Sequence, residues 1–132
     1  MIAVDTNLLV RLLVRDDESQ YQQAYKILQE NMIFVSNTVF LETEWVLRFT
    51  YKFPSAQVTE ALRRIAGFQN TQTEDIVLLQ LAFDWHEQGL DFADAMHLAL
   101  SQHCTQFVTF DRKFARRSRS LSTIPVGIPT QH

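Results

Sequence analysis

The sequence contains few of the residues that break regular structure or cross-link small proteins. Its 132 residues include three glycines, three prolines and a single cysteine, Cys104. So few turn-forming residues argue against an all-β protein with many tight turns. One cysteine cannot form an internal disulfide, which excludes a small disulfide-stabilised secreted scaffold and fits the reducing cytoplasm. We therefore expect a cytoplasmic protein.

Long hydrophobic runs are also missing. No segment approaches the roughly 20 apolar residues that a membrane-spanning helix needs. The N-terminus has no basic lead and Asp5 interrupts its apolar run, so we expect no signal peptide. Apolar residues make up 46% and charged residues 20% of the chain, which is ordinary for a globular protein. At this length we expect one domain, residues 1–132, with a single core and no membrane association.

Acidic residues are absent from the last part of the chain. Residues 1–111 contain all fifteen acidic residues and seven basic ones, a net charge of −8. Residues 112–132 contain five basic residues and no acid, a net charge of +5. Such a segment is either an ordinary solvated helix face or a contact for a polyanion. The five residues are Arg112, Lys113, Arg116, Arg117 and Arg119.

Apolar periodicity predicts short strands that alternate with helices. Strands are expected at residues 2–5, 32–36, 68–72, 106–110 and 124–128. Helices are expected at residues 6–14, 16–31, 37–51, 55–68 (with Ser55 as N-cap), 74–89 (closed by Gly89), 91–103 and 111–119. This alternation predicts an α/β fold with a central, mostly parallel sheet and helices on both of its faces. In such sheets ligands bind beyond the carboxyl ends of the strands, where the strand order reverses.

Carboxylates lie where the predicted core elements begin or end. Asp5 follows the first apolar strand and Asp111 follows the fourth, at the ends where a ligand would bind. Asp94 lies in a helix that is apolar nearly all round. Capping of that helix fully explains Asp91, and capping of the next helix is one explanation of Asp111. For Asp94, a functional role and a structural role in the first helical turn are both open.

The apolar helix at residues 37–51 carries two glutamates. Glu42 and Glu44 lie about 200° apart around a helix, so they cannot both face one site, and periodicity does not choose between them. Four aromatic residues occur in or just after this helix. They either belong to the core or line a groove for a partner protein. These aromatic residues are Trp45, Phe49, Tyr51 and Phe53.

The acids near these element ends predict a metal site. Carboxylates that converge without a counter-charge repel each other and raise one another's pKa. A divalent cation removes the repulsion, and ligands that are all oxygen suit Mg²⁺ or Mn²⁺. Imidazole and thiolate sites are not indicated, because Cys104 is alone and the four histidines lack ligand spacing. We therefore expect a Mg²⁺ (or Mn²⁺) site that includes Asp5, Asp94, Asp111 and one of the two glutamates.

The segments "VDTNLLVRLL", "VFLETEWVL", "DFADAMHLAL" and "FVTFDRKFAR" occur in an order and spacing that resembles the PIN domain family. Within that family the sequence is similar to the VapC-type toxin ribonucleases of toxin–antitoxin pairs. The resemblance implies a catalytic, metal-binding site of four acids, Asp5, Glu42, Asp94 and Asp111. It thereby selects Glu42 over Glu44, and it implies supporting roles for Thr6 and Asn7.

The resemblance also implies an architecture and an activity. The expected sheet has strand order 3-2-1-4-5, which places strands 1 and 4 side by side. The expected activity is Mg²⁺- or Mn²⁺-dependent cleavage of single-stranded RNA by metal-activated water, with the basic residues 112–119 holding the RNA backbone. The expected partners are a second copy of the chain, in a homodimer, and a cognate antitoxin that neutralises the enzyme.

Other functions compete with this one. A structure-specific or DNA nuclease of the same fold is one, and a non-catalytic metal- or nucleic-acid-binding module is another. The "VDTN" segment also resembles the first motif of haloacid-dehalogenase-type phosphatases, but Asn7 stands where that chemistry needs an acid. A receiver-type module would need an aspartate after the strand at 32–36, and the sequence has none there.

Overall fold

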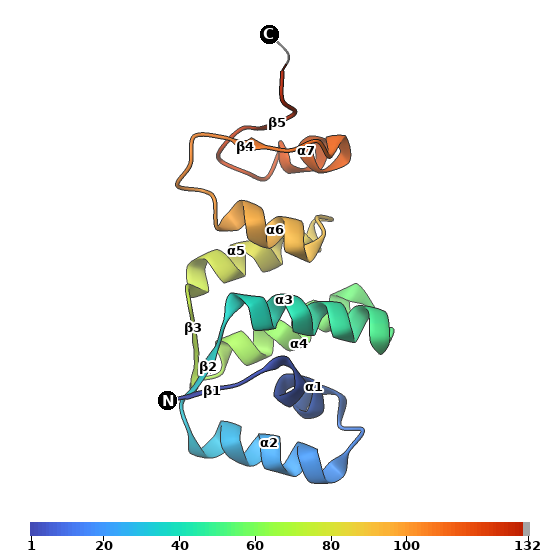
Figure 1. The fold of residues 1–132 in the computed structure, drawn as a ribbon, viewed down its shortest axis with the longest axis vertical. Helices are drawn as coiled ribbons and strands as arrows, with labels where there is room; N and C mark the ends of the chain where they lie inside the picture. Colours follow the sequence, from blue (N-terminus) through green and yellow to red (C-terminus); the bar gives the residue numbers. More distant parts are fainter. Residues whose placement is uncertain (131–132) are drawn as a thin grey trace. The chain divides into compact units, whose positions relative to one another are not determined.

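The computed structural model describes residues 1–130, which form two compact units (Figure 1). The N-terminal unit is Met1–Ile76, and the C-terminal unit is Val77–His132, described as far as residue 130. Seven α-helices and five short strands are present within the described residues. Each unit combines helices with parallel strands, which confirms the predicted α/β class. The expectation that residues 1–132 form a single domain stays a prediction.

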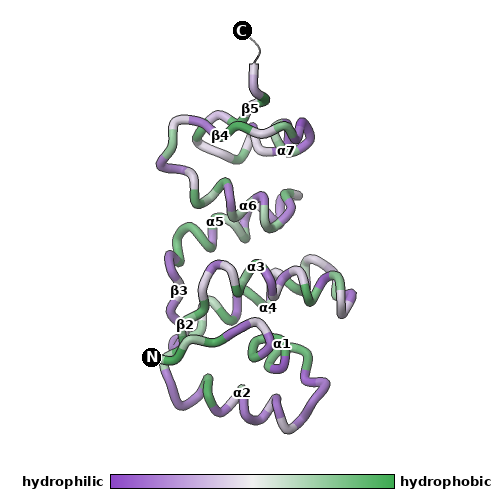
Figure 2. The backbone as a smooth tube through the Cα atoms, in the orientation of Figure 1, coloured by the Kyte–Doolittle hydropathy of each residue, from purple (hydrophilic) through white to green (hydrophobic). Residues whose placement is uncertain are grey.

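The N-terminal unit is built on a three-stranded parallel sheet in the order β1-β2-β3. Helix α1 packs against α2 and α3, and α4 packs against α3 and β3. Helix α2 is mainly hydrophilic along its length (Figure 2), and only Ala24 and Leu28 of it are buried. The elements are β1 (Ile2–Ala3), α1 (Thr6–Val14), α2 (Glu18–Glu30), β2 (Ile33–Val35), α3 (Asn37–Trp45), the π-helical segment η1 (Val46–Thr50), α4 (Ser55–Gly67) and β3 (Thr71–Thr73).

The core of this unit takes one or more large apolar side chains from most of its elements. Leu9, Ile33 and Phe40 are completely buried, because the apolar faces of α1, β2 and α3 all turn inward. The predicted burial of the first strand is right at its end, where Val4 is buried, and wrong at Ile2, which is 41% exposed. Asp5 therefore follows directly on a buried residue.

The C-terminal unit contains a second pair of parallel strands, β4 and β5. Aromatic pairs link its elements: Phe83 stacks on Phe92 with ring centroids 5.4 Å apart, and Phe107 meets Phe114 edge to face at 5.5 Å. These contacts join α5 to α6 and β4 to α7. The elements are α5 (Ile76–Glu87), which begins at the boundary between the units, α6 (Phe92–Ala99), β4 (Phe107–Val108), α7 (Arg112–Ser118) and β5 (Val126–Gly127).

The two sheets contain parts of the expected strand order. The order 3-2-1 is found in the N-terminal unit, and strands 4 and 5 pair in the C-terminal unit. The pairing of strand 1 with strand 4, which the resemblance implies, stays a prediction. Within the described chain, no helix is both long and apolar enough to cross a membrane.

Two predicted helix ends can be compared directly with the structure. Gly89 has φ +112°, a conformation that favours glycine, and its N–H bonds to the carbonyl of His86, so it closes α5 as predicted. The prediction that Ser55 caps α4 is wrong. Pro54 occupies the N-cap position and Ser55 is the first helical residue. A proline just before the helix sets an extended approach, and this local effect outweighs the preference of serine for the cap.

The helix at residues 37–51 is not regular throughout. After Trp45 it continues as η1, in which the N–H of Tyr51 bonds to the carbonyl of Val46 at 3.2 Å, five residues back. Such π-helical turns are rare and often occur at functional sites. The segment ends near Lys52, which has a left-handed φ of 61°. The apolar periodicity alone gave no sign of this turn.

Candidate active site

Two of the four candidate acids share a pocket in the C-terminal unit. Its volume is about 210 Å³, and its lining combines three aspartates with two basic side chains. The lining residues come from the turn after α5, from the start of α6 and from both turns of α7 with its N-cap. They are Gly89, Leu90, Asp91, Asp94, Asp111, Lys113, Phe114 and Arg117.

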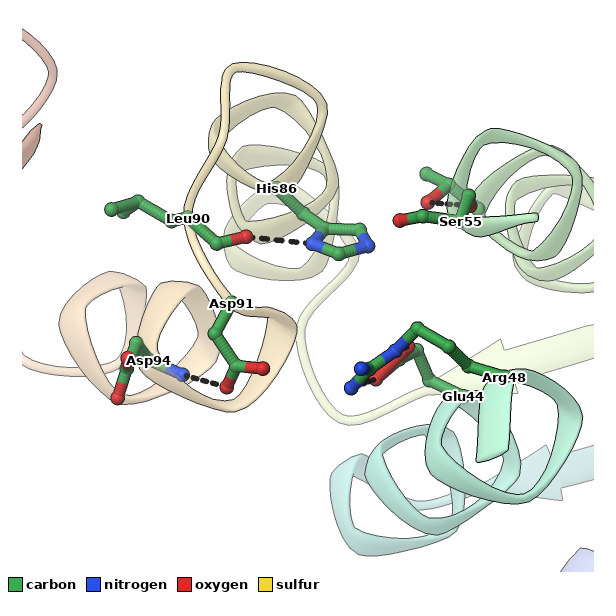
Figure 3. Close-up of polar contacts among 8 residues, drawn as sticks. Glu44, Arg48, Ser55, His86, Leu90, Asp91 and Asp94 are labelled. Atoms are coloured by element: carbon green, nitrogen blue, oxygen red, sulfur yellow. Dashed lines mark hydrogen bonds and ion pairs between the residues drawn. The ribbon is translucent and has the colours of Figure 1, made fainter. Parts of the chain in front are cut away.

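Asp94 sits in the first turn of α6, on the one polar stripe of an otherwise buried helix. Its backbone N–H points to Oδ2 of Asp91, the N-cap residue, at 3.4 Å (Figure 3). Burial raises the pKa of the Asp94 carboxyl, and the negative charges of Asp91 and Asp111 raise it further, while His97 acts in the opposite direction. The pocket therefore penalises the ionised form of Asp94 when no cation is present.

Asp111 is positioned by the start of α7. Its Oδ1 accepts a hydrogen bond from the N–H of Phe114 at 2.9 Å, and its own N–H donates to Oγ1 of Thr109 at 3.0 Å. This confirms that Asp111 is an N-cap. Because a carboxylate can accept about four hydrogen bonds or metal contacts, capping leaves Asp111 with capacity for a ligand.

The five basic residues of the C-terminal segment divide into two groups. Lys113 and Arg117 line the pocket one helical turn apart on α7, and Nη1 of Arg117 donates to the carbonyl of Gly89 at 3.0 Å. That hydrogen bond fixes the guanidinium against the turn that carries Asp91. The other three are exposed to solvent and are not among the lining residues. The sequence alone could not separate these three residues from the two that line the pocket. The three exposed residues are Arg112, Arg116 and Arg119.

Asp5 occupies the corresponding position in the N-terminal unit. It is the N-cap of α1, with Oδ1 accepting the N–H of Leu8 at 3.0 Å. The neighbouring Thr6 is buried, whereas Asp5 and Asn7 are exposed. Asp5 and Asp111 thus have the same local structure, a carboxylate held between the end of a strand and the first turn of a helix.

The two glutamates of α3 have different environments. Glu44 is 3% exposed and holds the guanidinium of Arg48 through two contacts of 2.6 and 3.1 Å (Figure 3). Glu42 is exposed to solvent. Glu44 therefore has a structural partner, Arg48 of the following segment η1, and the role of the exposed Glu42 as a ligand stays a prediction.

We expect substitution of the two glutamates to separate these roles. Glu44→Gln removes one partner of an ion pair whose acid is buried and whose Arg48 side chain is 27% exposed. The loss should lower the free energy of unfolding by about 2 kcal/mol, less than the roughly 3 to 5 kcal/mol of a fully buried pair. Glu42→Gln, the matched control, should change it by less than about 0.5 kcal/mol. Urea denaturation measures both values, and equal losses would contradict this assignment.

The structure brings Asp94 and Asp111 together, with Asp91 as a third carboxylate, and places Asp5 and Glu42 in the N-terminal unit. Among residues 1–130, no three acidic, histidine or cysteine side chains form a group close enough to hold a metal ion. The donors that line the pocket still suit a hard cation, because the metal-binding groups there are carboxylates. A cation would also offset the repulsion that raises the pKa of Asp94.

Comparison with protein families gives a match over residues 2–120, which includes all four candidate acids. The matching family is the PIN domain. The chain belongs to the PIN domain family. PIN domains are generally nucleases and typically use a divalent metal. A search of curated proteins finds no relative of this PIN domain.

Proposed function

We propose that this PIN domain is a metal-dependent endoribonuclease that cleaves single-stranded RNA and acts as the toxin of a toxin–antitoxin pair. The observation that carries the proposal is the pocket in which Asp94 and Asp111 lie with Lys113 and Arg117. Carboxylates and cations together suit a phosphodiester, because the acids hold a metal and the cations contact phosphate oxygens. The similarity of four segments to VapC-type toxins supports RNA as the substrate and the toxin role.

In this proposal the four acids together bind the metal, and two of them also cap helices. As the resemblance implies, Asp5, Glu42, Asp94 and Asp111 would hold the metal, which would supply activation of water and neutralisation of charge on the scissile phosphate. The N-cap hydrogen bonds of Asp5 and Asp111 keep their carboxylates from rotating. Thr6 and Asn7 support Asp5 from the first turn of α1.

Lys113 and Arg117 are the phosphate contacts of this proposal. Both line the pocket, and the Gly89 carbonyl orients Arg117. Arg112, Arg116 and Arg119 contribute a more distant attraction for RNA, which added salt weakens.

A cleavage assay on total RNA tests the proposed function. Wild-type protein with Mg²⁺ or Mn²⁺ should cut RNA at discrete positions. Each cut should give one fragment with a 5′-phosphate and one with a 3′-OH, because attack by water does not require the ribose 2′-OH. EDTA should abolish these ends. Asp5→Asn should abolish them too, and it is a cleaner change than Asp5→Ala because asparagine keeps the N-cap of α1.

Other results of this assay would favour the competing functions. Products that end in 2′,3′-cyclic phosphate would contradict attack by water. Cleavage of flap DNA offered in parallel, without cleavage of RNA, would indicate a structure-specific DNA nuclease. Metal binding without cleavage of either would indicate a non-catalytic PIN module.

The proposed partners are an antitoxin and a second copy of the chain. A groove of about 500 Å³ in the N-terminal unit lies among α1, α2 and α4. Its mainly apolar walls suit the apolar face of an amphipathic antitoxin helix. The resemblance to VapC-type toxins supports a homodimer. The proposed location is the cytoplasm, because the single exposed Cys104 suits a reducing compartment. Apolar residues on these walls include Leu12, Leu28, Ile65 and Phe68.

A further inference from the structure

Two aromatic side chains of the N-terminal unit are exposed side by side. Trp45 is 54% exposed and Phe49 is 48% exposed, and their ring centroids lie 5.1 Å apart with the rings tilted by 40°. The interpretation of these two residues as core is therefore wrong. Tyr51 and Phe53 are only partly exposed, and their rings stack on each other at 6.2 Å. Trp45 and Phe49 form a distinct surface, which we call the aromatic platform.

The aromatic platform is held in place by groups beneath it. The guanidinium of Arg48 lies over the ring of Phe49, 4.3 Å from its centroid, and the buried Glu44 fixes that guanidinium. The platform also coincides with the change from α3 to the π-helical turn, where Trp45 is the last residue of α3. Because an anchored cation packs against the ring of Phe49, the platform is preorganised and its side chains are restricted in their rotamers.

The aromatic platform continues the face of α3 that carries Glu42. Trp45 follows Glu42 by three residues, so the two side chains lie on one face, about 4.5 Å apart along the helix axis. Both are exposed. A strand of nucleic acid with a phosphate near Glu42 would therefore meet Trp45 and then Phe49 with its neighbouring nucleotides.

We propose that the aromatic platform stacks consecutive bases of a single-stranded RNA beside Glu42. This inference rests on the proposed ribonuclease function and adds the residues that select single strands. Aromatic side chains bind unpaired bases through ring faces that every base possesses, whereas bases in a duplex already stack on one another. The exposed Lys52, which follows η1, adds a positive charge to a unit that is otherwise acidic, whereas the charge of Arg48 is paired with Glu44. The position of the platform on the face of α3 that carries Glu42, an acid of the proposed metal site, favours RNA over an apolar helix.

Tryptophan fluorescence tests the proposal directly, because Trp45 is exposed and Trp85, the other tryptophan, is 4% exposed. A short single-stranded RNA of mixed sequence, added in EDTA so that it is not cut, should quench the emission of Trp45. The same strand with abasic sites, and an RNA duplex, should quench it far less. Trp45→Phe should remove the quenching, since the remaining Trp85 is shielded.

Substitutions measure how much the aromatic platform contributes to binding. Phe49→Ala should weaken RNA binding by roughly 5- to 150-fold, the range for loss of one base-stacking ring. Met32→Ala, which removes another exposed apolar side chain of the same unit, should leave binding unchanged. Circular dichroism of each variant establishes that it is folded. Trp45→Phe, which keeps a ring, should retain most of the affinity in a filter-binding assay.

Three results would overturn the inference. Equal quenching by the abasic strand would mean that the phosphates are bound and the bases are not. Unchanged affinity in a folded Phe49→Ala variant would mean that the rings do not contact RNA. Dissociation of a dimer by Trp45→Ala, with RNA affinity unchanged, would assign the surface to a second copy of the chain.

The test separates this inference from the proposed function. If wild-type protein cuts RNA while folded Trp45→Ala and Phe49→Ala variants bind RNA normally, only the platform is wrong. If the rings bind unpaired bases but no metal-dependent cleavage occurs, the ribonuclease proposal is wrong and a single-strand-binding module remains.

Discussion

Asp94→Asn is expected to reduce metal-dependent cleavage by at least about 100-fold, the scale of losing one electrostatic stabiliser in an active site. The same change should leave the metal-free protein as stable as the wild type, or more stable. The reason is that burial and the charges of Asp91 and Asp111 raise the pKa of Asp94, so its ionised form costs the folded state free energy. Asparagine has nearly the same shape without that charge.

The pH dependence of stability follows from the same shift. A carboxyl whose pKa is raised on folding binds protons more tightly in the folded state, so its contribution lowers stability as pH rises through the raised pKa. Above the raised pKa the full cost is present. Thermal unfolding in EDTA should therefore show a smaller loss of stability between acid and neutral pH for Asp94→Asn than for the wild type.

An exposed acid outside the pocket serves as the control for Asp94→Asn. Glu30→Gln changes an exposed acid at the end of α2, outside the pocket, and should alter neither cleavage nor the pH dependence of unfolding. A marked fall in the melting temperature of metal-free Asp94→Asn would contradict the functional role. It would indicate instead that Asp94 serves chiefly to start α6.

Mg²⁺ is expected to raise the melting temperature of the wild type substantially and that of Asp94→Asn only slightly. A ligand that binds only the folded state at 100 times its dissociation constant stabilises it by about 2.7 kcal/mol. In a chain of this length that corresponds to roughly 10 °C. If loss of one carboxylate weakens metal binding about 100-fold, the gain falls to about 0.4 kcal/mol.

Thermal scans with Mg²⁺, with Mn²⁺ and with EDTA measure this difference. The matched variant is again Glu30→Gln, which should respond to Mg²⁺ as the wild type does. An equal rise in all three proteins would place the stabilising cation away from Asp94. No rise in any of them would remove the metal from the proposed mechanism.

The sequence predicted the order of the elements well because each begins or ends at a residue with a strong local preference. Asp91 and Asp111 were recognisable as N-caps, and Gly89 as a helix stop, since capping depends on a few adjacent residues. The N-cap role of Asp5 was not predicted and comes from the structure. Ser55 shows the limit of this reasoning. It has the right chemistry for a cap, but Pro54 takes the position.

The parts that escaped prediction depend on contacts between segments distant in sequence or on departures from regular geometry. Periodicity could not choose between Glu42 and Glu44, whereas the burial of Glu44 against Arg48 separates them at once. The sequence left open whether Trp45 and Phe49 are core or exposed, because large aromatic residues in an apolar helix are usually core, and their exposure in the structure decides the question. A single charge run gave no reason to separate two pocket-lining cations from the other three. The metal-binding role of the four acids stays a prediction.

The N-cap role of Asp5 and Asp111, combined with their proposed metal-binding role, bears on the abundance of variant proteins in a cell. Each carboxylate caps a helix, so an alanine in its place should cost about 1 kcal/mol of stability, whereas an asparagine caps as well as the aspartate does. Losses of about 1 to 2 kcal/mol can change steady-state abundance several-fold, because proteases remove the unfolded fraction. Alanine variants should therefore be both inactive and scarce. Asparagine variants should persist at full abundance, and such intact but inactive copies would still compete for the partners of the active protein.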